Sequence, residues 1–465
     1  MPAAIQIGDG KTFALADLLR RLNEIQAMAN GGRLAEAEAA CRAVIAAAPD
    51  MPEAVAVQGF LLGRLHRVEE ARAHLEAAIA ARGDVPHWHL ELAQSYRRTL
   101  RLDDALARSR EAVRLDPNDS RFHLGLARVL VDRGDNDAAR EALLAALAVA
   151  PDDVEAHLAQ AHLLLAEGEY RAAWEEYEWR FRAPRFQTAM PRFTAPVWNG
   201  MRLPGRRILV AADQGFGDAF QFCRYLPLVA ERCAGVVVLC RAAQVALFSR
   251  IPGVEACVVS INDVGPHAVW CWMGSLPRLF GTTLTNIPGG RAYLSPEPRR
   301  KAIWRDRLAP LSPAGSVRVG VVWAGNPENS MDWRRSVPLS LLARLASIER
   351  LALVSLQVQA PEADRATMAA MGLLDVSAEL TDFQETASLI ANLDLVVSVD
   401  SAVAHLAAAM GVPTWVLVYR PADWRWLIGR EDSPWYPSVR LFRQDTPGDW
   451  TTPVGRLIEA LGGPV

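Results

Sequence analysis

Three short segments of the sequence place charged residues directly after apolar runs that predict strands. The first is Asp213-Gln-Gly-Phe-Gly-Asp, which follows the apolar run 208–212 and precedes a predicted helix. Gly215 and Gly217 allow the backbone to turn sharply and to come close to a ligand. Two interpretations of Asp218 stay open. Its carboxylate either only caps the helix by accepting a backbone N–H, or serves a substrate at the carboxyl edge of a sheet.

The second segment begins at Trp323, where another apolar run ends, and passes through a loop at Asn326 to Arg334 and Arg335. Adjacent guanidinium groups beside a strand end suit phosphate oxygens, because each can donate paired, charge-assisted hydrogen bonds. The alternative is a solvated basic loop. Trp323 and Asn326 are candidates to line the same donor-binding surface, although a buried core tryptophan is the more frequent case.

In the third segment, an apolar run ends at Asp400, and Ser401 and Ala402 open a helix. The unpaired N–H groups of that first turn, from Ser401 to Val403, predict an anion site that the helix dipole strengthens. Asp400 is placed to accept hydrogen bonds from sugar hydroxyls. Under the alternative interpretation, Asp400 or Ser401 only caps the helix, and His405, one turn further on, packs against a neighbour.

The elements that position these segments are two groups of strands and helices. Continuous runs of Val, Leu and Ile predict strands buried on both faces of parallel sheets, and the helical patterns between them predict the crossovers. The six runs are 208–212, 236–240, 317–323, 351–356, 395–399 and 414–418. We expect one α/β lobe at 206–300, a second at 301–445 and a C-terminal helix at 446–465. The proline-rich stretch 183–205 predicts a connector without a continuous helix. We expect its aromatic residues to pack against the first lobe.

The composition is that of a globular protein with several domains. The chain of 465 residues has room for about three domains, and its net charge of −3 gives no positive field for a polyanion, so we expect no nucleic-acid partner. Its six cysteines form no C-x-x-C pair. The sequence shows no signal-peptide pattern and no apolar run of the ~18 residues that span a bilayer. These features predict a cytoplasmic protein without a transmembrane segment.

A repeat with a 34-residue step occupies residues 14–182. Small residues recur at this step, and so do turn residues: Pro49, Gly83, Pro117 and Pro151. The pattern resembles the tetratricopeptide repeat over four to five units. The resemblance implies an α-solenoid whose concave groove binds a protein or peptide.

Three histidines also recur at this step: His89, His123 and His157. A column of metal ligands is one interpretation of them. A scaffold role at a helix-packing position is the more common case for one histidine per repeat.

Taken together, Gly217-Asp218, the Arg334/Arg335 pair and the segment 400–407 resemble the motifs of heptosyltransferase-type glycosyltransferases over roughly residues 206–445. The resemblance implies the GT-B architecture of two Rossmann-like lobes. It implies that Asp218 is the catalytic base, and that the arginines and the Asp-Ser turn hold the phosphates and sugar of the donor. Ala402 stands where the family usually has glycine, and arginines stand where a lysine is common, which leaves the phosphate grouping of the donor open.

Longer motifs at 213–227, 423–426 and 432–437 resemble a branch in which a repeat array precedes the catalytic region, and some members of that branch are flagellin glycosyltransferases. This resemblance implies an inverting transferase that uses a nucleotide sugar, needs no other cofactor and acts on a Ser/Thr hydroxyl of a protein held by the repeats, flagellin being one candidate. No Asp-x-Asp or histidine-rich grouping in 206–445 supplies an evident metal site, so a metal-independent reaction is expected. The alternatives are a lipopolysaccharide or other glycan acceptor, or an inactive transferase that serves as a protein-binding scaffold. Repeat arrays often self-associate, but the sequence fixes no oligomeric state.

Overall fold

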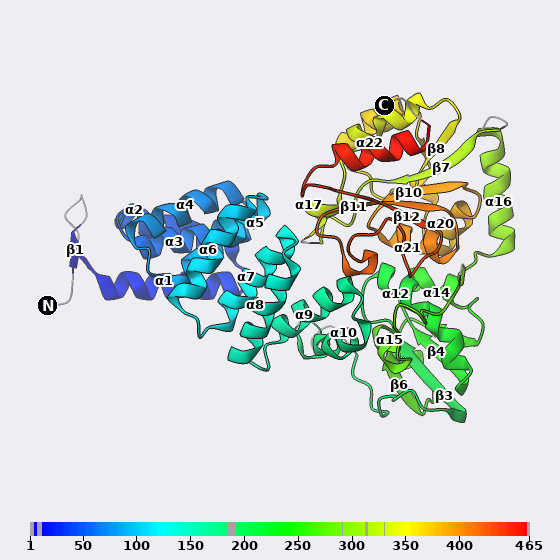
Figure 1. The fold of residues 1–465 in the computed structure, drawn as a ribbon, viewed down its shortest axis with the longest axis horizontal. Helices are drawn as coiled ribbons and strands as arrows, with labels where there is room; N and C mark the ends of the chain where they lie inside the picture. The colour runs from blue at the N-terminus through cyan, green and yellow to red at the C-terminus, as the bar shows by residue number, and fades with distance from the viewer. Residues whose placement is uncertain are drawn as a thin grey trace. The chain divides into compact units, whose positions relative to one another are not determined.

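The computed structural model describes residues 4–6, 12–184, 186, 191–290, 292–311, 315–329 and 331–462. The chain divides into two compact units, Met1–Leu163 and Leu164–Val465 (Figure 1). In the described ranges, no helix is long and apolar enough to cross a membrane.

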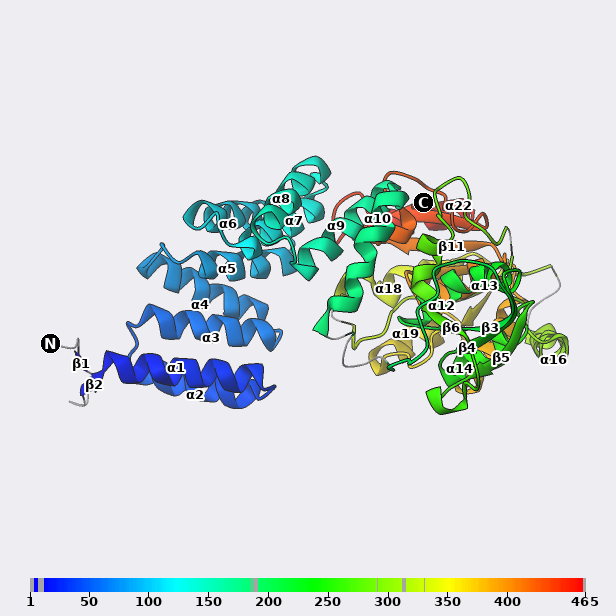
Figure 2. The same ribbon diagram turned by 90° about the horizontal axis from the view of Figure 1, so that it is seen from below.

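The first unit is a series of antiparallel helical hairpins, as the 34-residue pattern predicts. Figure 2 shows the hairpins stacked in chain order. A two-stranded hairpin, β1 (Ala4–Gln6) and β2 (Thr12–Ala14), precedes them. The helices are α1 (Leu15–Asn30), α2 (Leu34–Ala47), α3 (Pro52–Arg64), α4 (Val68–Ala81), α5 (Pro86–Arg98), α6 (Leu102–Leu115), α7 (Ser120–Arg133) and α8 (Asn136–Val149), followed by α9 (Val154–Glu167), which crosses into the second unit.

Small residues lie where these helices cross. The alanines that recur at the repeat step in the second helix of each hairpin are fully buried: Ala37, Ala71, Ala105 and Ala139. At Gly59, a Cβ atom would lie only 2.7 Å from Cγ of Leu75. A larger side chain at such a crossing would force the two backbones apart, which explains why the sequence keeps small residues there.

The three repeating histidines bind backbone carbonyls. Nε2 of His89 lies 2.9 Å from the carbonyl oxygen of Gly83. Nε2 of His123 and of His157 each lie 2.8 Å from the carbonyl oxygens of Pro117 and Pro151. Each ring therefore ties a helix to the turn before it, which supports the scaffold interpretation. Among the described residues, no group of three or more His, Cys, Asp or Glu is arranged to hold a metal ion.

The second unit begins with the end of α9, followed by α10 (Tyr170–Tyr177) and the 3-10 helix η1 (Glu178–Arg182). The connector after them is held by aromatic contacts, as the sequence predicts. The ring centroid of Phe193 lies 4.3 Å from that of Trp270, and that of Phe186 lies 5.5 Å from that of Trp272. Trp198 is buried beside Phe280.

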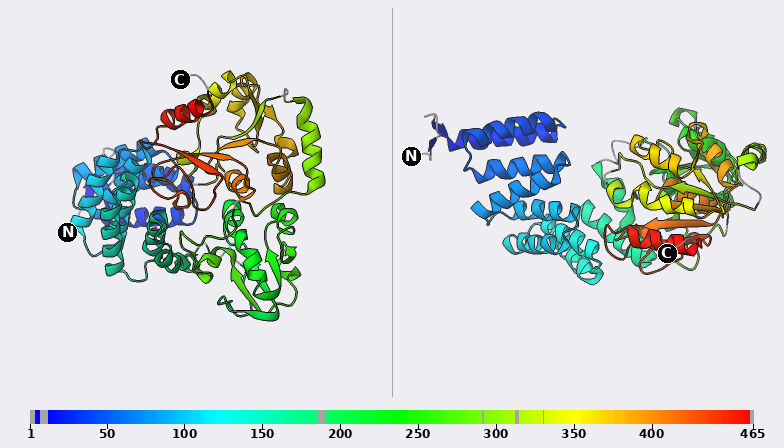
Figure 3. Two further views of the ribbon diagram at one scale, coloured as in Figure 1. Left: turned by 45° about the vertical axis from the view of Figure 1, so that its right-hand side comes forward. Right: turned by 90° about the horizontal axis from the view of Figure 1, so that it is seen from above.

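The first lobe has a four-stranded parallel sheet in the order β5-β4-β3-β6. Its strands are β3 (Leu203–Ala211), β4 (Cys233–Leu239), β5 (Val254–Val258) and β6 (Val269–Trp272). Its helices are α12 (Phe216–Phe222), η2 (Cys223–Tyr225), α13 (Leu226–Ala230), α14 (Ala242–Phe248), η3 (Ile261–Asp263), η4 (Met273–Ser275) and α15 (Leu276–Leu279). The lobe is drawn in green in Figure 3.

The second lobe has a six-stranded parallel sheet in the order β12-β11-β10-β7-β8-β9. Its strands are β7 (Val317–Val322), β8 (Leu351–Ser355), β9 (Leu374–Asp375), β10 (Leu395–Val399), β11 (Thr414–Val418) and β12 (Val439–Arg443). If the six strands are numbered 1 to 6 in chain order and the sheet is followed from β9 to β12, the strand order is 3-2-1-4-5-6. This is the strand order of the Rossmann fold.

Helices complete the second lobe. They are α16 (Pro298–Leu308), η5 (Ala309–Leu311), α17 (Asp332–Arg335), α18 (Leu339–Leu342), η6 (Ala343–Ser347), η7 (Glu362–Asp364), α19 (Arg365–Ala370), η8 (Ser377–Glu379), α20 (Phe383–Ile390), α21 (Ala402–Ala409), η9 (Trp424–Trp426) and α22 (Thr451–Ala460). The predicted fold class, a helical solenoid followed by two α/β lobes, is confirmed.

Candidate functional site

The predicted segments lie at the points where the strand order of each sheet reverses. In the first lobe, β3 lies between β4 and β6, and the turn 213–218 leaves its carboxyl end. In the second lobe, β7 and β10 are neighbours, and the segments that contain Asn326 and Asp400 leave their carboxyl ends. Open α/β sheets bind ligands in the crevice at such a switch point. The topology therefore explains why these three segments carry the polar groups.

The two switch points meet, because α12 of the first lobe packs against α21 of the second. A Cβ atom at Gly217 would lie 2.8 Å from Cδ2 of His405. This distance is shorter than real Cβ contacts, so only glycine fits there without a shift of the histidine ring or of one helix. Gly217 thus serves the contact between the lobes.

A Gly217→Ala variant is expected to lower the thermal midpoint, because the new methyl group would push α12 away from His405. Gly455→Ala in α22 is the matched control, since no atom lies within 4 Å of its added Cβ. An alanine in place of an unstrained helical glycine stabilises by about 0.5–1 kcal/mol, so the control should raise the midpoint. Equal stabilisation by both variants, measured by differential scanning fluorimetry, would contradict the close contact.

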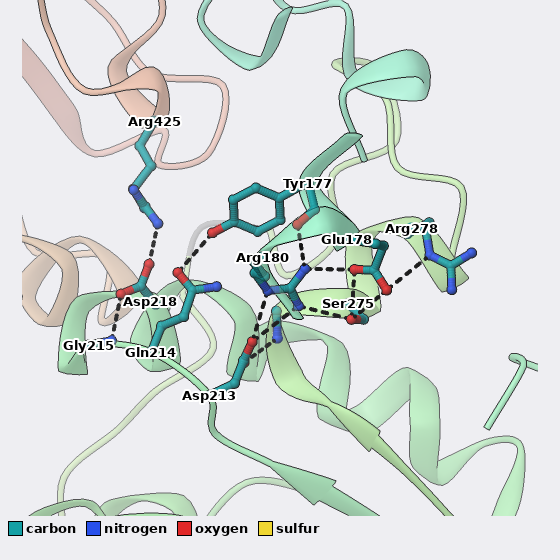
Figure 4. A network of polar contacts seen from close by, with 11 residues as sticks. Tyr177, Glu178, Arg180, Asp213, Gln214, Gly215, Asp218, Ser275, Arg278 and Arg425 are labelled. Atoms are coloured by element: carbon teal, nitrogen blue, oxygen red, sulfur yellow. Dashed lines mark hydrogen bonds and ion pairs between the residues drawn. The ribbon is translucent and has the colours of Figure 1, made fainter. Parts of the chain in front are cut away.

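Asp218 takes part in both the helix start and the contact between the lobes (Figure 4). Its Oδ2 accepts a hydrogen bond of 2.8 Å from the N–H of Gly215, which is the N-cap of α12. The capping interpretation therefore holds in part, with Asp218 three positions inside the helix. Its Oδ1 accepts from Nη2 of Arg425 in the second lobe. The side chain is 20% exposed, so a substrate hydroxyl can still approach it.

Arg425 in η9 is a residue that the candidate set from the sequence did not include. Besides Asp218, its guanidinium donates to Oδ1 of Asp423 at 2.8 Å and to Oε1 of Gln221 at 2.7 Å. Burial disfavours the charged form of Arg425, but the carboxylates of Asp423 and Asp218 outweigh it and raise the pKa of the guanidinium. One cation thus joins a turn of each lobe.

Asp400 lies beside the same group. Its Oδ1 is 3.6 Å from Nε2 of His405, whose Nδ1 lies 2.9 Å from the hydroxyl of Tyr436. The imidazole also stacks on Trp426, with ring centroids 5.1 Å apart. Burial alone would raise the pKa of Asp400, but the contact with His405 and the positive charges of Arg425 and Arg335 hold it below its ordinary value. Asp400 is therefore an ionised acceptor at the start of α21.

The first turn of α21 has the geometry expected from the sequence. Oγ of Ser401 caps the helix by accepting from the N–H of Ala404 at 3.3 Å. The backbone N–H of His405 makes the first bond of the helix, 3.3 Å from the carbonyl oxygen of Ser401. The N–H groups of Ala402 and Val403 precede that bond, and both residues are partly exposed. An anion site at these amides remains a prediction.

Arg334 and Arg335 end the short helix α17, and a loop holds Arg335 in place. Nε of Arg335 donates to Oδ1 of Asp332 at 2.9 Å, and Oγ of Ser336 donates to the other oxygen of that carboxylate at 2.8 Å. A Cβ atom at Gly325 would overlap the side-chain ends of Asp332 and Arg335, so a larger residue there would displace the guanidinium of Arg335. Asp332 and Gly325 are positioning residues that the sequence analysis did not single out.

Tyr419 follows β11 and is partly buried near charged groups. Burial raises the pKa of the Tyr419 hydroxyl, the carboxylates of Asp423 and Asp400 add to this effect, and Arg334 and Arg335 oppose it. All four charges therefore act on one hydroxyl at the end of β11.

Trp323 and Asn326 differ from the other candidates. Trp323 is 1% exposed, and its Nε1 donates to Oδ2 of Asp364 at 2.8 Å. Its ring is a core group and offers no free face to a donor in this structure, which corrects its assignment to the donor surface. Asn326 is exposed, and its Oδ1 accepts from the N–H of Glu328 at 3.1 Å, so it shapes the loop before α17.

Comparison with known proteins finds similarity in both parts of the chain. Residues 58–120 and 101–163 match tetratricopeptide repeat families. Residues 351–447 match glycosyltransferase family 9 (heptosyltransferase), and this range contains Asp400, the start of α21 and Arg425.

Individual proteins are also similar to parts of the chain. Protein FlbA of Caulobacter vibrioides is 30% identical over 316 residues, which cover 62% of this chain and 52% of FlbA, so the chain spans about half of that relative. Among solved structures, the thermophilic TPR protein TTC0263 of Thermus thermophilus is 22% identical, with a TM-score of 0.33 over 36% of this chain and 92% of that one. MamA is 15% identical, with a TM-score of 0.31 over 36% of this chain and 97% of that one. The chain is therefore similar to tetratricopeptide repeat proteins over residues 58–163 and to heptosyltransferases of glycosyltransferase family 9 over residues 351–447.

Proposed function

We propose that the protein is an inverting, metal-independent glycosyltransferase of GT-B architecture. In this proposal it moves a sugar from a nucleotide-sugar donor to a Ser/Thr hydroxyl of a protein that the repeats recruit, flagellin being one candidate. One observation carries the proposal: Asp218 at the switch point of the first lobe contacts Arg425, beside Asp400 at the switch point of the second. A carboxylate on one lobe thus faces positive groups and a helix start on the other.

The donor side of the reaction uses the second lobe. The phosphates of the donor bind at the N–H groups of Ala402 and Val403 and at the guanidinium of Arg335. Arg334 is the alternative to Arg335 in this role. These groups stabilise the negative charge that develops on the leaving phosphate. Asp400, ionised beside His405, accepts hydrogen bonds from sugar hydroxyls.

The acceptor side uses the first lobe. The acceptor oxygen attacks the anomeric carbon of the sugar from the face opposite the phosphate, and its proton passes to Asp218. As the new C–O bond forms, the bond to the phosphate oxygen breaks and its electron pair leaves with the phosphate, which inverts the configuration. General-base assistance of this kind contributes ~10²–10⁴ in rate.

The six cysteines are free thiols, which supports a reducing compartment such as the cytoplasm as the place of this reaction. The proposal is tested by a thermal-shift panel of UDP-, ADP-, GDP- and CMP-linked sugars, followed by a transfer assay read by intact-protein mass. A ligand at 100 times its dissociation constant stabilises a protein by about 2.7 kcal/mol, so one donor class should give a clear shift. Donor binding with a mass increase on a protein acceptor supports the proposal. Transfer only to a glycan acceptor overturns its acceptor half, and absence of any shift favours an inactive scaffold.

An Arg335→Ala variant is expected to bind the donor nucleotide about 10- to 100-fold more weakly in calorimetry, because a hydrogen bond to a charged group contributes ~1.5–3 kcal/mol. Arg307→Ala in α16 is the control: it removes the same charge from an exposed arginine of the same lobe, which pairs with Glu379. Unchanged affinity in the first variant, or equal weakening in both, would move the phosphate site away from α17.

A further inference from the structure

We propose that α10 and η1, the last helical segment of the repeat pattern, are part of the transferase site. Tyr177 and Arg180 act there as positioning residues: they hold the turn 213–218 and, through it, Asp218. The inference rests on the proposed function in one respect, the role of Asp218 as base. The repeat pattern gives no hint of this role, because α10 carries Ala173 at the same step as the buried alanines of the earlier repeats.

The first step is that α10 is fixed against both lobes. Nε1 of Trp174 donates to the carbonyl oxygen of Thr282 in the first lobe at 3.0 Å. The ring of Trp174 lies edge-on to that of Trp424 in the second lobe, with centroids 5.7 Å apart. The hydroxyl of Tyr170 accepts from Nε1 of Trp435 at 2.7 Å. Since α10 touches both lobes, its side chains can set the geometry between them.

The second step is that Arg180 clamps the end of β3. Its Nη2 and Nε lie 3.1 Å and 3.2 Å from Oδ2 of Asp213, and Nη2 also donates to Oγ of Ser275 at 2.9 Å. The other oxygen of Asp213 accepts from the N–H of Gly274 at 2.9 Å. Arg180 and Asp213 are 5% and 4% exposed. A buried ion pair of this kind is costly to form unless its geometry is satisfied, so it fixes the conformation around it.

Glu178 closes the network from the other side (Figure 4). Its Oε1 accepts from Nη1 of Arg180 at 2.7 Å and from Oγ of Ser275 at 2.8 Å. A Cβ atom at Gly274 would lie 2.9 Å from Oδ2 of Asp213, so the backbone at the end of β6 must come this close for the network to form. Arg180 thereby joins η1 to the carboxyl ends of β3 and β6, the two strands of the switch point.

The third step leads from Tyr177 to Asp218. The hydroxyl of Tyr177 donates to Oε1 of Gln214 at 2.8 Å, and Gln214 precedes Gly215, whose N–H bonds to Asp218. Burial raises the pKa of Tyr177 to about 12, and the charges of Arg425 and Asp218 also act on it. The hydroxyl of Tyr177 therefore bonds to the residue that directly precedes the N-cap of α12.

The turn needs support from outside because it contains two glycines, Gly215 and Gly217, which have little conformational preference of their own. A displacement of about 1 Å in a catalytic group can cost ~10² in rate. The hydroxyl of Tyr177 and the guanidinium of Arg180 supply fixed hydrogen bonds to the two residues before Gly215. The last repeat segment thereby becomes a requirement for catalysis rather than a separable module.

The test compares Tyr177→Phe with Tyr96→Phe in the full-length protein. Tyr177→Phe removes one O–H group and keeps the ring contact with Trp174, whose centroid lies 6.0 Å away. Tyr96→Phe is a matched control, because that buried tyrosine donates an equivalent bond of 2.7 Å to Glu76 within the first unit. Amide hydrogen exchange of peptides that contain 213–218 is measured by mass spectrometry, together with kcat and KM for the UDP-, ADP-, GDP- or CMP-sugar that the panel selects.

Tyr177→Phe is expected to speed exchange in 213–218 and to lower kcat about 10-fold with KM for the donor unchanged, while Tyr96→Phe changes neither. Arg180→Lys, which keeps the charge but not the forked geometry, should speed exchange in the same peptide. Unchanged exchange in Tyr177→Phe, or the same kcat loss in the control, overturns the proposal. So does an effect on KM alone. Faster exchange in a protein that neither binds nor hydrolyses any donor supports the positioning of the turn and overturns only the proposed transferase function.

Discussion

An Asp218→Asn variant is expected to lose ~10²–10⁴ of the transfer rate while it keeps its fold and its affinity for the donor. Asparagine retains an oxygen that can accept the N–H of Gly215, which Oδ2 accepts at 2.8 Å in the structure. It cannot take a proton from the acceptor hydroxyl. The loss should therefore appear in kcat, measured in a transfer assay at saturating donor, and not in the calorimetric affinity for the donor.

Asp119→Asn is the matched control for this prediction. Asp119 also accepts a backbone N–H at a helix start, that of Arg121 at 2.9 Å, and also pairs with an arginine. Its side chain is 21% exposed, against 20% for Asp218. The control should therefore show the stability cost of losing one such carboxylate with full transfer activity. Wild-type turnover by Asp218→Asn would remove Asp218 from the role of base.

The strands that the sequence pattern predicted share one property, which is burial on both faces. The six apolar runs correspond to β3, β4, β7, β8, β10 and β11, which occupy the interior of the two sheets. Within these two sheets, the strands that the pattern missed are β5, β6, β9 and β12, which lie at the edges. The edge strand β5, Val-Glu-Ala-Cys-Val, is half exposed and carries a charged residue. Hydrophobic runs reveal strands only where both faces are covered.

The candidate site residues that could be predicted are the charged residues that follow a strand along the chain. Asp400 stands directly after an apolar run, and Asp218 ends the turn that follows another, so their positions at a sheet edge could be inferred from the sequence. Arg425 could not be inferred in this way, since its partner Asp218 lies 207 positions away. Its one signal was the Asp-Trp-Arg-Trp motif. Tyr177 and Arg180 were not predicted as site residues, because the repeat pattern assigned their segment to the solenoid.

Position after a strand also leaves the side-chain direction undetermined. Trp323 follows β7 as Asp400 follows β10, yet its ring lies in the core and bonds to Asp364. Successive residues of an extended segment point to opposite faces, and residues that leave a strand have no fixed alternation. Only the packing of the helices around β7 decides which side chain meets the ligand, and that packing depends on residues distant in the sequence.

An Arg425→Met variant is expected to lower the stability of the second unit by on the order of 3 kcal/mol, because it leaves Asp218 and Asp423 together without their shared cation. Arg425 is 11% exposed in its side chain, so water does little to replace it. Methionine keeps much of the volume and of the contact with Trp424, over whose ring the guanidinium carbon lies at 4.3 Å. The loss would be read as a shift of the thermal midpoint.

The Arg430→Met control removes an arginine from the neighbouring pair with Asp432, whose side chains are 36% and 69% exposed. An exposed pair of this kind contributes about 0–1 kcal/mol, so the control should shift the midpoint little. The double variant Arg425→Met with Asp218→Asn should recover part of the loss, because one unpaired carboxylate is gone, with a coupling energy of about 0.5–3 kcal/mol. If the two single losses simply add, the ion pair between the lobes does not hold them together, and other contacts between the lobes, such as that between Gly217 and His405, must do so.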